Sequence, residues 1–137
     1  MERALKDQCV PTLRQAQFKG SFPNFYREDN DFVALVNFQF SLSGGSFCVN
    51  LSYTDRRGRN LYFRPDTEVR KLSVSQTTER LRLGTKKQGS DNWYSFGRTS
   101  YGEFRGDPLL VATITANIKD QLRSQAEQWW ADKRRQA

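Results

Sequence analysis

The apolar residues near the C-terminus recur at every fourth position. Because residues three or four apart share one face of an α-helix, this spacing predicts an amphipathic helix of about 25 residues. Asp107 is a typical N-cap residue and Pro108 suits the first helical turn, so we expect the helix to begin there. Its buried face would carry Leu110, Ile114, Ile118, Leu122, Ala126 and Trp130.

A second helical pattern lies at the N-terminus, between residues 2 and 18. We expect Gly20 to end this helix. Pro11 lies inside the pattern, and since proline cannot donate a backbone hydrogen bond, we expect either a kink or a helix that starts at Pro11. The apolar positions on its shared face are Leu5, Cys9, Leu13 and Ala16.

The middle of the chain alternates between apolar and polar residues, a period of two that is typical of β-strands. Residues 32–40 and 47–53 each place aromatic and aliphatic side chains on one face. Gly44-Gly45 between them is a strong signal for a two-residue hairpin turn, because both turn positions need a positive φ. This turn pairs Phe40 with Val49, Phe38 with Leu51, Val36 with Tyr53 and Gln39 with Asn50.

Shorter segments complete the expected sheet. Residues 22–27 read as a strand that the polar turn 28–31 connects to the strand at 32–40. Together the patterns predict one α+β domain over residues 1–137, with an N-terminal helix, an antiparallel β-meander and a long C-terminal helix packed on the sheet. Further strand candidates that extend the same sheet are residues 61–63, 81–83 and 93–96.

The composition narrows the chemistry that the chain can perform. The sequence has no histidine and two cysteines. Without histidine the chain lacks the commonest general base and cannot form a Ser-His or Cys-His catalytic pair. Two cysteines are too few ligands for a typical zinc site. We therefore expect no metal and no cofactor. With no secretory signal and no apolar run of about 18 residues, we expect a cytoplasmic protein, not bound to a membrane, in which Cys9 and Cys48 are buried thiols.

The formal net charge of +7 is concentrated in the middle of the chain. Residues 55–106 carry 12 of the 22 basic residues and 6 of the 15 acidic ones, and aromatic residues interleave with them. Such a segment is suited to bind nucleic acid, and equally well to bind an acidic protein surface. The plainer interpretation is that the charged side chains face solvent and the aromatic side chains lie in the core. The candidate partner-binding residues are Arg56, Arg57, Arg59, Arg64, Arg80, Arg82, Lys86, Lys87, Trp93, Tyr94, Arg98 and Arg105.

Two polar features are further candidates for a ligand site. Asn37, Gln39 and Asn50 fall on the outer face of the predicted hairpin, where their amides could bind the polar groups of a ligand or simply face solvent. Residues 95–106 are rich in glycine, but neither of the phosphate-binding fingerprints GxGxxG and GxxxxGK[ST] occurs. We therefore interpret this segment as a surface loop.

The order of several short motifs resembles the bacterial domain-of-unknown-function 4304 family. The leading helix is followed by Phe18-Lys19, Phe25-Tyr26-Arg27, Val36-Asn37-Phe38-Gln39, Phe47-Cys48-Val49-Asn50-Leu51, Arg80-Leu81-Arg82-Leu83-Gly84 and Trp93. The resemblance implies a small, single-domain cytoplasmic protein, and it supplies no catalytic residue. Small domains of this kind often occur among the immunity proteins of bacterial toxin systems.

The sequence therefore favours a non-catalytic binding protein over an enzyme. We expect an immunity-type protein that neutralises a bacterial toxin by direct contact, using the basic residues of 55–106 against an acidic protein surface. The alternative is a nucleic-acid-binding module that uses the same segment. Catalysis is the least favoured interpretation, because arginine, asparagine and carboxylates would have to perform it without histidine.

Overall fold

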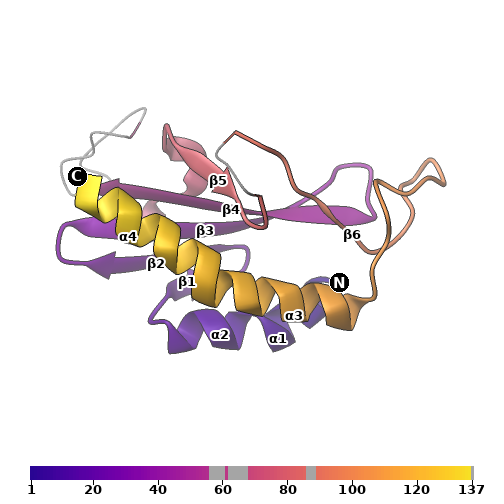
Figure 1. Cartoon of the computed structure of the whole chain (residues 1–137), viewed down its shortest axis with the longest axis horizontal. Helices are drawn as coiled ribbons and strands as arrows, with labels where there is room; N and C mark the ends of the chain where they lie inside the picture. Colours follow the sequence, from indigo (N-terminus) through magenta and orange to yellow (C-terminus); the bar gives the residue numbers. More distant parts are fainter. Residues whose placement is uncertain (56–60, 62–67, 86–88, 137) are drawn as a thin grey trace.

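The computed structural model describes residues 1–55, 61, 68–85 and 89–136. Within these residues an antiparallel sheet crosses the molecule and α-helices cover one of its faces (Figure 1), which confirms the α+β class. The elements are α1 (Glu2–Gln8), α2 (Val10–Gln15), β1 (Lys19–Ser21), β2 (Asn24–Asp29), β3 (Phe32–Phe40), β4 (Ser46–Asp55), η1 (Val69–Lys71), η2 (Val74–Gln76), β5 (Arg80–Arg82), β6 (Tyr94–Ser95), α3 (Val111–Gln121), η3 (Leu122–Ala126) and α4 (Glu127–Gln136).

The strands form a meander in the order β1-β2-β3-β4-β5, and β6 also pairs with β4. β5 lies beside residues 50–52 of β4 and β6 beside residues 46–47, so the two short strands share the second edge of β4. This confirms that the segments near residues 81–83 and 93–96 extend the same sheet. Of the third candidate, Leu61 makes a bridge with Thr77, whereas Tyr62 and Phe63 lie outside the described residues.

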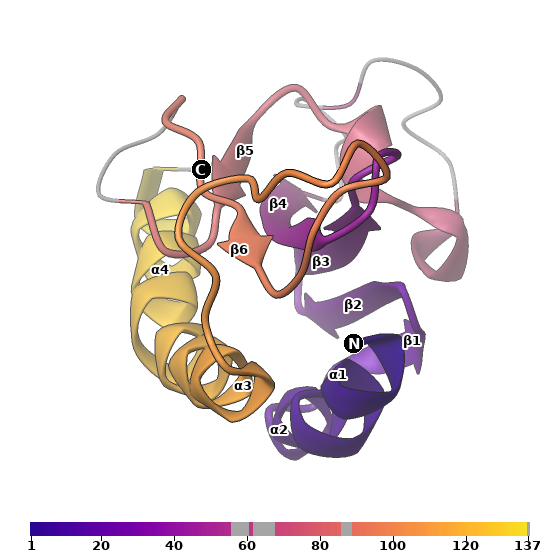
Figure 2. The ribbon, with the colours of Figure 1, turned by 90° about the vertical axis from the view of Figure 1, so that its right-hand side faces the viewer.

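The main core lies between the sheet and the helices, which bracket one face of the sheet in Figure 2. The predicted inward faces of β3 and β4 are confirmed, since Val36, Phe38, Val49 and Leu51 are all buried. The predicted apolar stripe of the C-terminal helix, which consists of its residues at every fourth position, is also confirmed, with the exception of Leu110, which is 77% exposed. Its buried members are Ile114, Ile118, Leu122, Ala126 and Trp130.

The N-terminal helix is broken at Cys9, as the position of Pro11 predicts. α1 and α2 meet at this residue, and Pro11 stands in the first turn of α2, where its missing N–H removes no helical hydrogen bond. Cys9 and Leu5 are fully buried, so the break does not interrupt the apolar face. Leu5, Cys9 and Leu13 therefore all belong to the main core in spite of the break.

α2 ends at a residue that the sequence pattern does not reveal. Gln17 has a φ of 74°, and the amides of Gln17 and Phe18 donate to the carbonyls of Arg14 (3.0 Å) and Leu13 (2.9 Å), which is a Schellman motif. The prediction that Gly20 ends the helix is wrong. Gly20 lies in β1, where a Cβ atom would stand 2.6 Å from a carbonyl oxygen of β2.

β3 and β4 form the predicted hairpin, but their register is shifted by two residues. Because side chains alternate with a period of two, this shift leaves every residue on its predicted face. The predicted pairs of Phe40 with Val49, Phe38 with Leu51, Val36 with Tyr53 and Gln39 with Asn50 are nevertheless wrong. The observed pairs are Phe40 with Phe47, Phe38 with Val49, Val36 with Leu51, Asn37 with Asn50 and Gln39 with Cys48.

A five-residue loop, 41–45, replaces the expected two-residue turn. The amide of Ser41 donates to the carbonyl of Ser46 (2.9 Å) and closes the loop. Gly45 has the positive φ that the prediction requires, but it serves a different contact, because its carbonyl accepts hydrogen bonds from the amides of Phe96 (2.9 Å) and Gly97 (3.1 Å). The second glycine of the pair is therefore needed for packing outside the hairpin.

The turn between β2 and β3 is also shorter than expected. β2 continues through Glu28 to Asp29, which pairs with Phe32, so the turn contains Asn30-Asp31 alone rather than residues 28–31. Asn30 has a φ of 55°, a conformation that asparagine adopts more readily than most residues. β1 is an edge strand that the pattern does not predict.

The C-terminal helix begins later than predicted. The amide of Leu109 donates to the carbonyl of Ser95 (2.9 Å), which holds the chain in an extended form beside β6. α3 therefore starts at Val111, and Leu110 is its N-cap residue. The assignment of Asp107 and Pro108 to the helix start is wrong, because a tertiary contact overrides their local preference.

One wide turn interrupts this helix between α3 and α4. Residues 122–126 form a π-helix. In an α-helix of 3.6 residues per turn, a stripe at every fourth residue drifts by about 40° at each step. The π-helical turn takes up this drift, so that Ile118 and Trp130 both stay buried against the sheet. The indole Nε1 of Trp130 donates to the carbonyl of Ser52 (2.9 Å).

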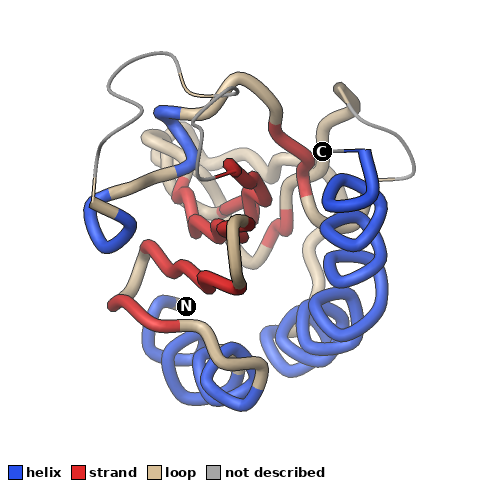
Figure 3. Tube along the Cα trace, turned by 90° about the vertical axis from the view of Figure 1, so that its left-hand side faces the viewer, coloured by secondary structure: helices blue, strands red, loops and turns tan. Residues whose placement is uncertain are grey.

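The second face of the sheet is covered as well. The short helices η1 and η2 lie on the side away from α3 and α4 in Figure 3, and Val74 of η2 and Leu72, which follows η1, pack against Val33 and Leu35. Of the two alternatives for this face, simple exposure to solvent is therefore wrong for β4. Its buried polar or thiol side chains on that face are Cys48, Asn50, Ser52 and Thr54.

Candidate functional site

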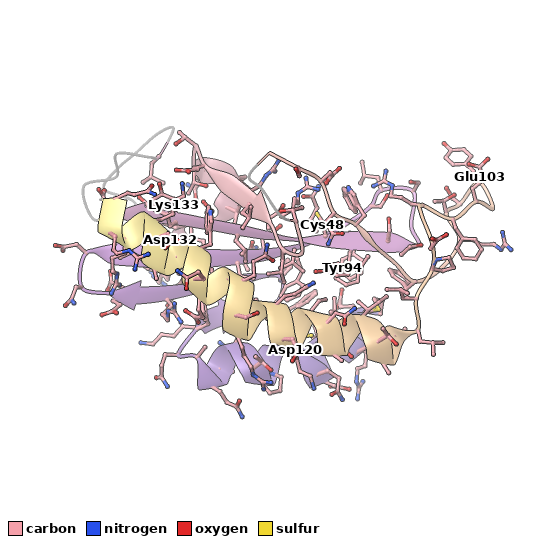
Figure 4. The ribbon with its side chains drawn as sticks, in the orientation of Figure 1. Cys48, Tyr94, Glu103, Asp120, Asp132 and Lys133 are labelled. Carbon is pink, nitrogen blue, oxygen red and sulfur yellow. The ribbon has the colours of Figure 1, made fainter. Side chains whose placement is uncertain are left out.

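Large apolar side chains are exposed at one end of the described structure. We call this group the apolar tip. In Figure 4 the labelled Glu103 marks this end, opposite to Asp132 and Lys133, and Figure 2 views it face on. Grouped exposed apolar side chains are typical of protein interaction sites. The tip consists of Leu42, Tyr101, Phe104, Leu109, Leu110 and Val111, of which Leu42 and Tyr101 are the most exposed.

Two chain reversals, which carry Leu42, Tyr101 and Phe104 of the tip, are joined to each other. The amide of Ser100 donates to the carbonyl of Ser43 (2.7 Å), which ties the hairpin around Tyr101 to the β3–β4 loop. A Cβ atom on Gly45 would stand 2.5 Å from the carbonyl oxygen of Gly97, so the backbones of the two reversals touch because Gly45 has no side chain. The two reversals therefore behave as one unit.

The hairpin that carries Tyr101 is also held by its own contacts. Arg98 and Phe104 form a β-bridge, and the guanidinium of Arg98 lies 4.3 Å from the centroid of the Phe104 ring and donates to the carbonyl of Gly102 (2.9 Å). The amide of Thr99 donates to the carbonyl of Glu103 (2.6 Å). Tyr101 is thus presented at the apex of an ordered hairpin, and a partner would not need to order it on binding.

The structure describes six of the twelve residues of the predicted partner surface, and four of these six are basic. Arg80 and Arg98 are exposed, as is Arg105, whereas Arg82 is mostly buried. The basic residues of the prediction that lie outside the described residues are Arg56, Arg57, Arg59, Arg64, Lys86 and Lys87.

Three of the predicted residues form a stack beside β5. Arg82 pairs with Asp91 (2.5 Å), and the indole of Trp93 donates to the same carboxylate (3.0 Å). The guanidiniums of Arg82 and Arg105 lie 5.2 Å and 4.4 Å from the centroid of the Trp93 ring, so this ring already has planar partners within the protein. Tyr94 is buried on the core side of β4, and its assignment to a partner surface is wrong.

The three predicted amides come together in one row across the sheet. Asn37 Nδ2 donates to Asn24 Oδ1 (2.8 Å), and Asn50 Nδ2 donates to Asn37 Oδ1 (3.0 Å) and to Gln39 Oε1 (2.9 Å). Asn50 is buried and Asn37 half-buried, whereas Gln39 is exposed. The hydrogen bonds of Asn50 are thus made within the sheet, which supports a structural role in fixing the register of β3 against β4.

Both thiols are shielded and protonated at neutral pH. Burial raises the pKa of Cys9 to about 11, and its Sγ donates to the carbonyl of Thr115 (3.8 Å). Burial also raises the pKa of Cys48, which the nearby Arg82 partly opposes. Because the thiolate is the reactive form, neither cysteine suits nucleophilic chemistry. No group of three or more metal-binding side chains occurs among the described residues.

The comparisons with known proteins identify the family. A family model described as "Domain of unknown function (DUF4304)" matches residues 9–132. The chain belongs to this family. The match reaches α4, so the C-terminal helix of this DUF4304 chain is part of the family pattern. No curated protein and no solved structure matches the chain. Within the described part of this DUF4304 chain, no helix is both long and apolar enough to cross a membrane.

The pattern of the sequence did not indicate the apolar tip of this DUF4304 chain. Leu110 fits the helical stripe by its spacing, but Leu109-Leu110-Val111 is a run of three apolar residues that one helix face cannot bury. That run, together with an aromatic residue, Tyr101, inside a glycine-rich loop, is the signal that could have found the site.

Proposed function

We propose that this protein is a non-catalytic binding protein of the cytoplasm, which recognises a protein partner through the apolar tip. The observation that carries the proposal is the exposure of six large apolar side chains at one end of the described structure, three of them on an ordered unit. Aromatic side chains such as Tyr101 are enriched in protein interfaces, where they contribute a large contact area at a small entropic cost. The two shielded thiols support binding over covalent catalysis.

Charge supports a partner with an acidic surface. Arg98 and Arg105 are exposed beside the tip, and the chain as a whole carries a net charge of +7. Association with an acidic protein is then fast and weakens as salt is added. A bacterial toxin that the protein neutralises by direct contact is one partner of this kind, and the proposal therefore includes an immunity-type role.

A photocrosslinking experiment tests this function. A benzophenone amino acid replaces Tyr101 in the full chain, expressed in its own host, and a matched variant carries the same group at the exposed Gln128 of α4. We expect a protein adduct from position 101 that is absent from position 128 and insensitive to nuclease. An adduct that disappears with nuclease assigns the tip to nucleic acid instead, and equal adducts from both positions contradict the proposal.

The captured protein is then purified and its affinity measured for the wild type and two single variants, Tyr101→Ser and Leu110→Ser. Truncation of an interface anchor weakens binding by at least about 2 kcal/mol, which corresponds to roughly thirtyfold in affinity. Gln128→Ser serves as the control and should bind as the wild type does. Unchanged affinity in both tip variants would refute the proposed function.

A further inference from the structure

A cleft of about 250 Å³ opens between α4 and the hairpin formed by β2 and β3. It lies near the end of the molecule that is opposite to the apolar tip, where the C-terminus is marked in Figure 1. Four charged side chains and two aromatic rings line it, together with the small side chain of Ala131. Its volume suits a small molecule.

Two ion pairs cross the cleft in opposite directions. On one side Arg27 of β2 donates to both carboxylate oxygens of Glu127 on α4 (2.8 and 2.7 Å). On the other side Arg134 of α4 donates to the carboxylate (2.9 Å) and the carbonyl (3.0 Å) of Asp29 on β2. Each wall of the cleft therefore presents one positive and one negative group, and the order is reversed between the walls.

The aromatic part of the cleft is fixed from outside. The ring of Phe32 stacks on Tyr53, with 5.4 Å between centroids, and the indole of Trp130 donates to the carbonyl of Ser52 (2.9 Å). Ala131 stands beside Trp130 on α4, and its small side chain leaves the space open. The walls are thus in place before a ligand arrives, which reduces the free energy that binding must spend on ordering.

The charge pattern selects the class of ligand. A simple anion would meet the carboxylates of Asp29 and Glu127, and a simple cation would meet the guanidiniums of Arg27 and Arg134. A guanidinium has five N–H donors and a carboxylate about four acceptor sites, so each pair has capacity beyond the bonds described above. Phe32 and Trp130 are only 6% and 3% exposed, and the guanidiniums of Arg134 and Arg27 lie 5.1 Å and 5.3 Å from the centroids of their rings, so the charged groups dominate the lining. A molecule that carries both charges matches them.

We propose that this cleft binds a free α-amino acid. The ammonium group lies against the carboxylates and the carboxylate against the guanidiniums, next to the small side chain of Ala131. This inference is independent of the proposed function, because it uses no residue of the apolar tip.

The test is a titration of the full chain, labelled with ¹⁵N, with L-alanine, L-leucine and L-phenylalanine, in which the indole resonance of Trp130 is followed. We expect saturable shifts with a dissociation constant of about 1 mM for at least one of the three. The best of them is then compared with its N-acetylated and its amidated forms, each of which lacks one charge. We expect each blocked form to bind at least about tenfold more weakly.

A matched pair of variants locates the site. Ala131→Leu fills the cleft without changing its charges, whereas Ala116→Leu makes the same change at an exposed position of α3. Binding should be lost in the first variant and retained in the second. The proposal is overturned if none of the three amino acids shifts the Trp130 resonance at about 10 mM, if the blocked forms bind equally well, or if Ala131→Leu binds as the wild type does. The comparison with blocked ligands uses the wild type, so it stands even if Ala131→Leu fails to fold.

Discussion

The two glycines of the β3–β4 loop provide a sharp test of how the tip is assembled. Gly44 and Gly45 have nearly equal φ values, 81° and 78°, so an alanine at either position costs about 1–2 kcal/mol for the left-handed backbone. Their surroundings differ. A Cβ atom on Gly44 meets nothing within 4 Å, whereas one on Gly45 would stand 2.5 Å from the carbonyl oxygen of Gly97 and 2.8 Å from that of Arg98.

The difference between the two alanine variants therefore isolates the backbone contact between the reversals. We expect Gly44→Ala to lower the free energy of unfolding by about 1–2 kcal/mol, and Gly45→Ala by about 1–3 kcal/mol more, because the two backbones must separate. Urea unfolding followed by tryptophan fluorescence measures both values, and amide spectra should show shifts around Gly97 only for Gly45→Ala. Equal losses of stability, within about 0.5 kcal/mol, would show that the reversals do not depend on this contact.

Three further predictions concern the core. Ile118→Ala removes a fully buried side chain and should lower the free energy of urea unfolding by about 2–5 kcal/mol, whereas Ala116→Gly, on the exposed face of the same helix, should cost only about 1 kcal/mol. Trp130→Phe leaves the buried carbonyl of Ser52 without its indole donor and should cost about 1–3 kcal/mol, and a loss below about 0.5 kcal/mol would contradict the importance of this bond. The thiol of Cys9 has a pKa raised from 9.0 to about 11, so the unfolded chain loses this proton first, and stability should fall between these pH values by up to about 1.4 kcal/mol per pH unit. A pH series of urea midpoints should show a smaller slope for Cys9→Ala, and an unchanged slope would disprove the assignment.

The parts of the fold that the sequence predicts well are those that depend only on the spacing of apolar residues along the chain. The alternation in β3 and β4 and the stripe of α3 and α4 depend on which residues must be buried, and this information is local. The register and the start of α3 could not be found in this way. They depend on Gly45 touching Gly97 and on Leu109 bonding to Ser95, contacts between segments that are far apart in the chain.

The candidate sites are less predictable for the same reason. The apolar tip combines Leu42 with residues 101–111, and the cleft combines Arg27 with Glu127, which is 100 residues away. A charge count along the chain could not show that Arg82 and Arg105 are engaged with Trp93. The alternation along neighbouring strands predicts that Asn37, Gln39 and Asn50 share one face, but their bonding to one another depends on the register.

The π-helical turn at residues 122–126 gives the C-terminal helix one residue more than a continuous α-helix would need. Arg123 and Ser124 are exposed, so many side chains should be accepted at these positions. Deletion of one of them would restore a continuous α-helix in which Ile118 and Trp130 are about 11 residues apart, so that their directions differ by only about 20°. Insertion of a further residue would instead rotate everything that follows by about 100°, and would turn Trp130 away from Ser52 and Arg134 from Asp29. Within this family we therefore expect substitutions and single-residue deletions in the segment to be tolerated and insertions to be rare.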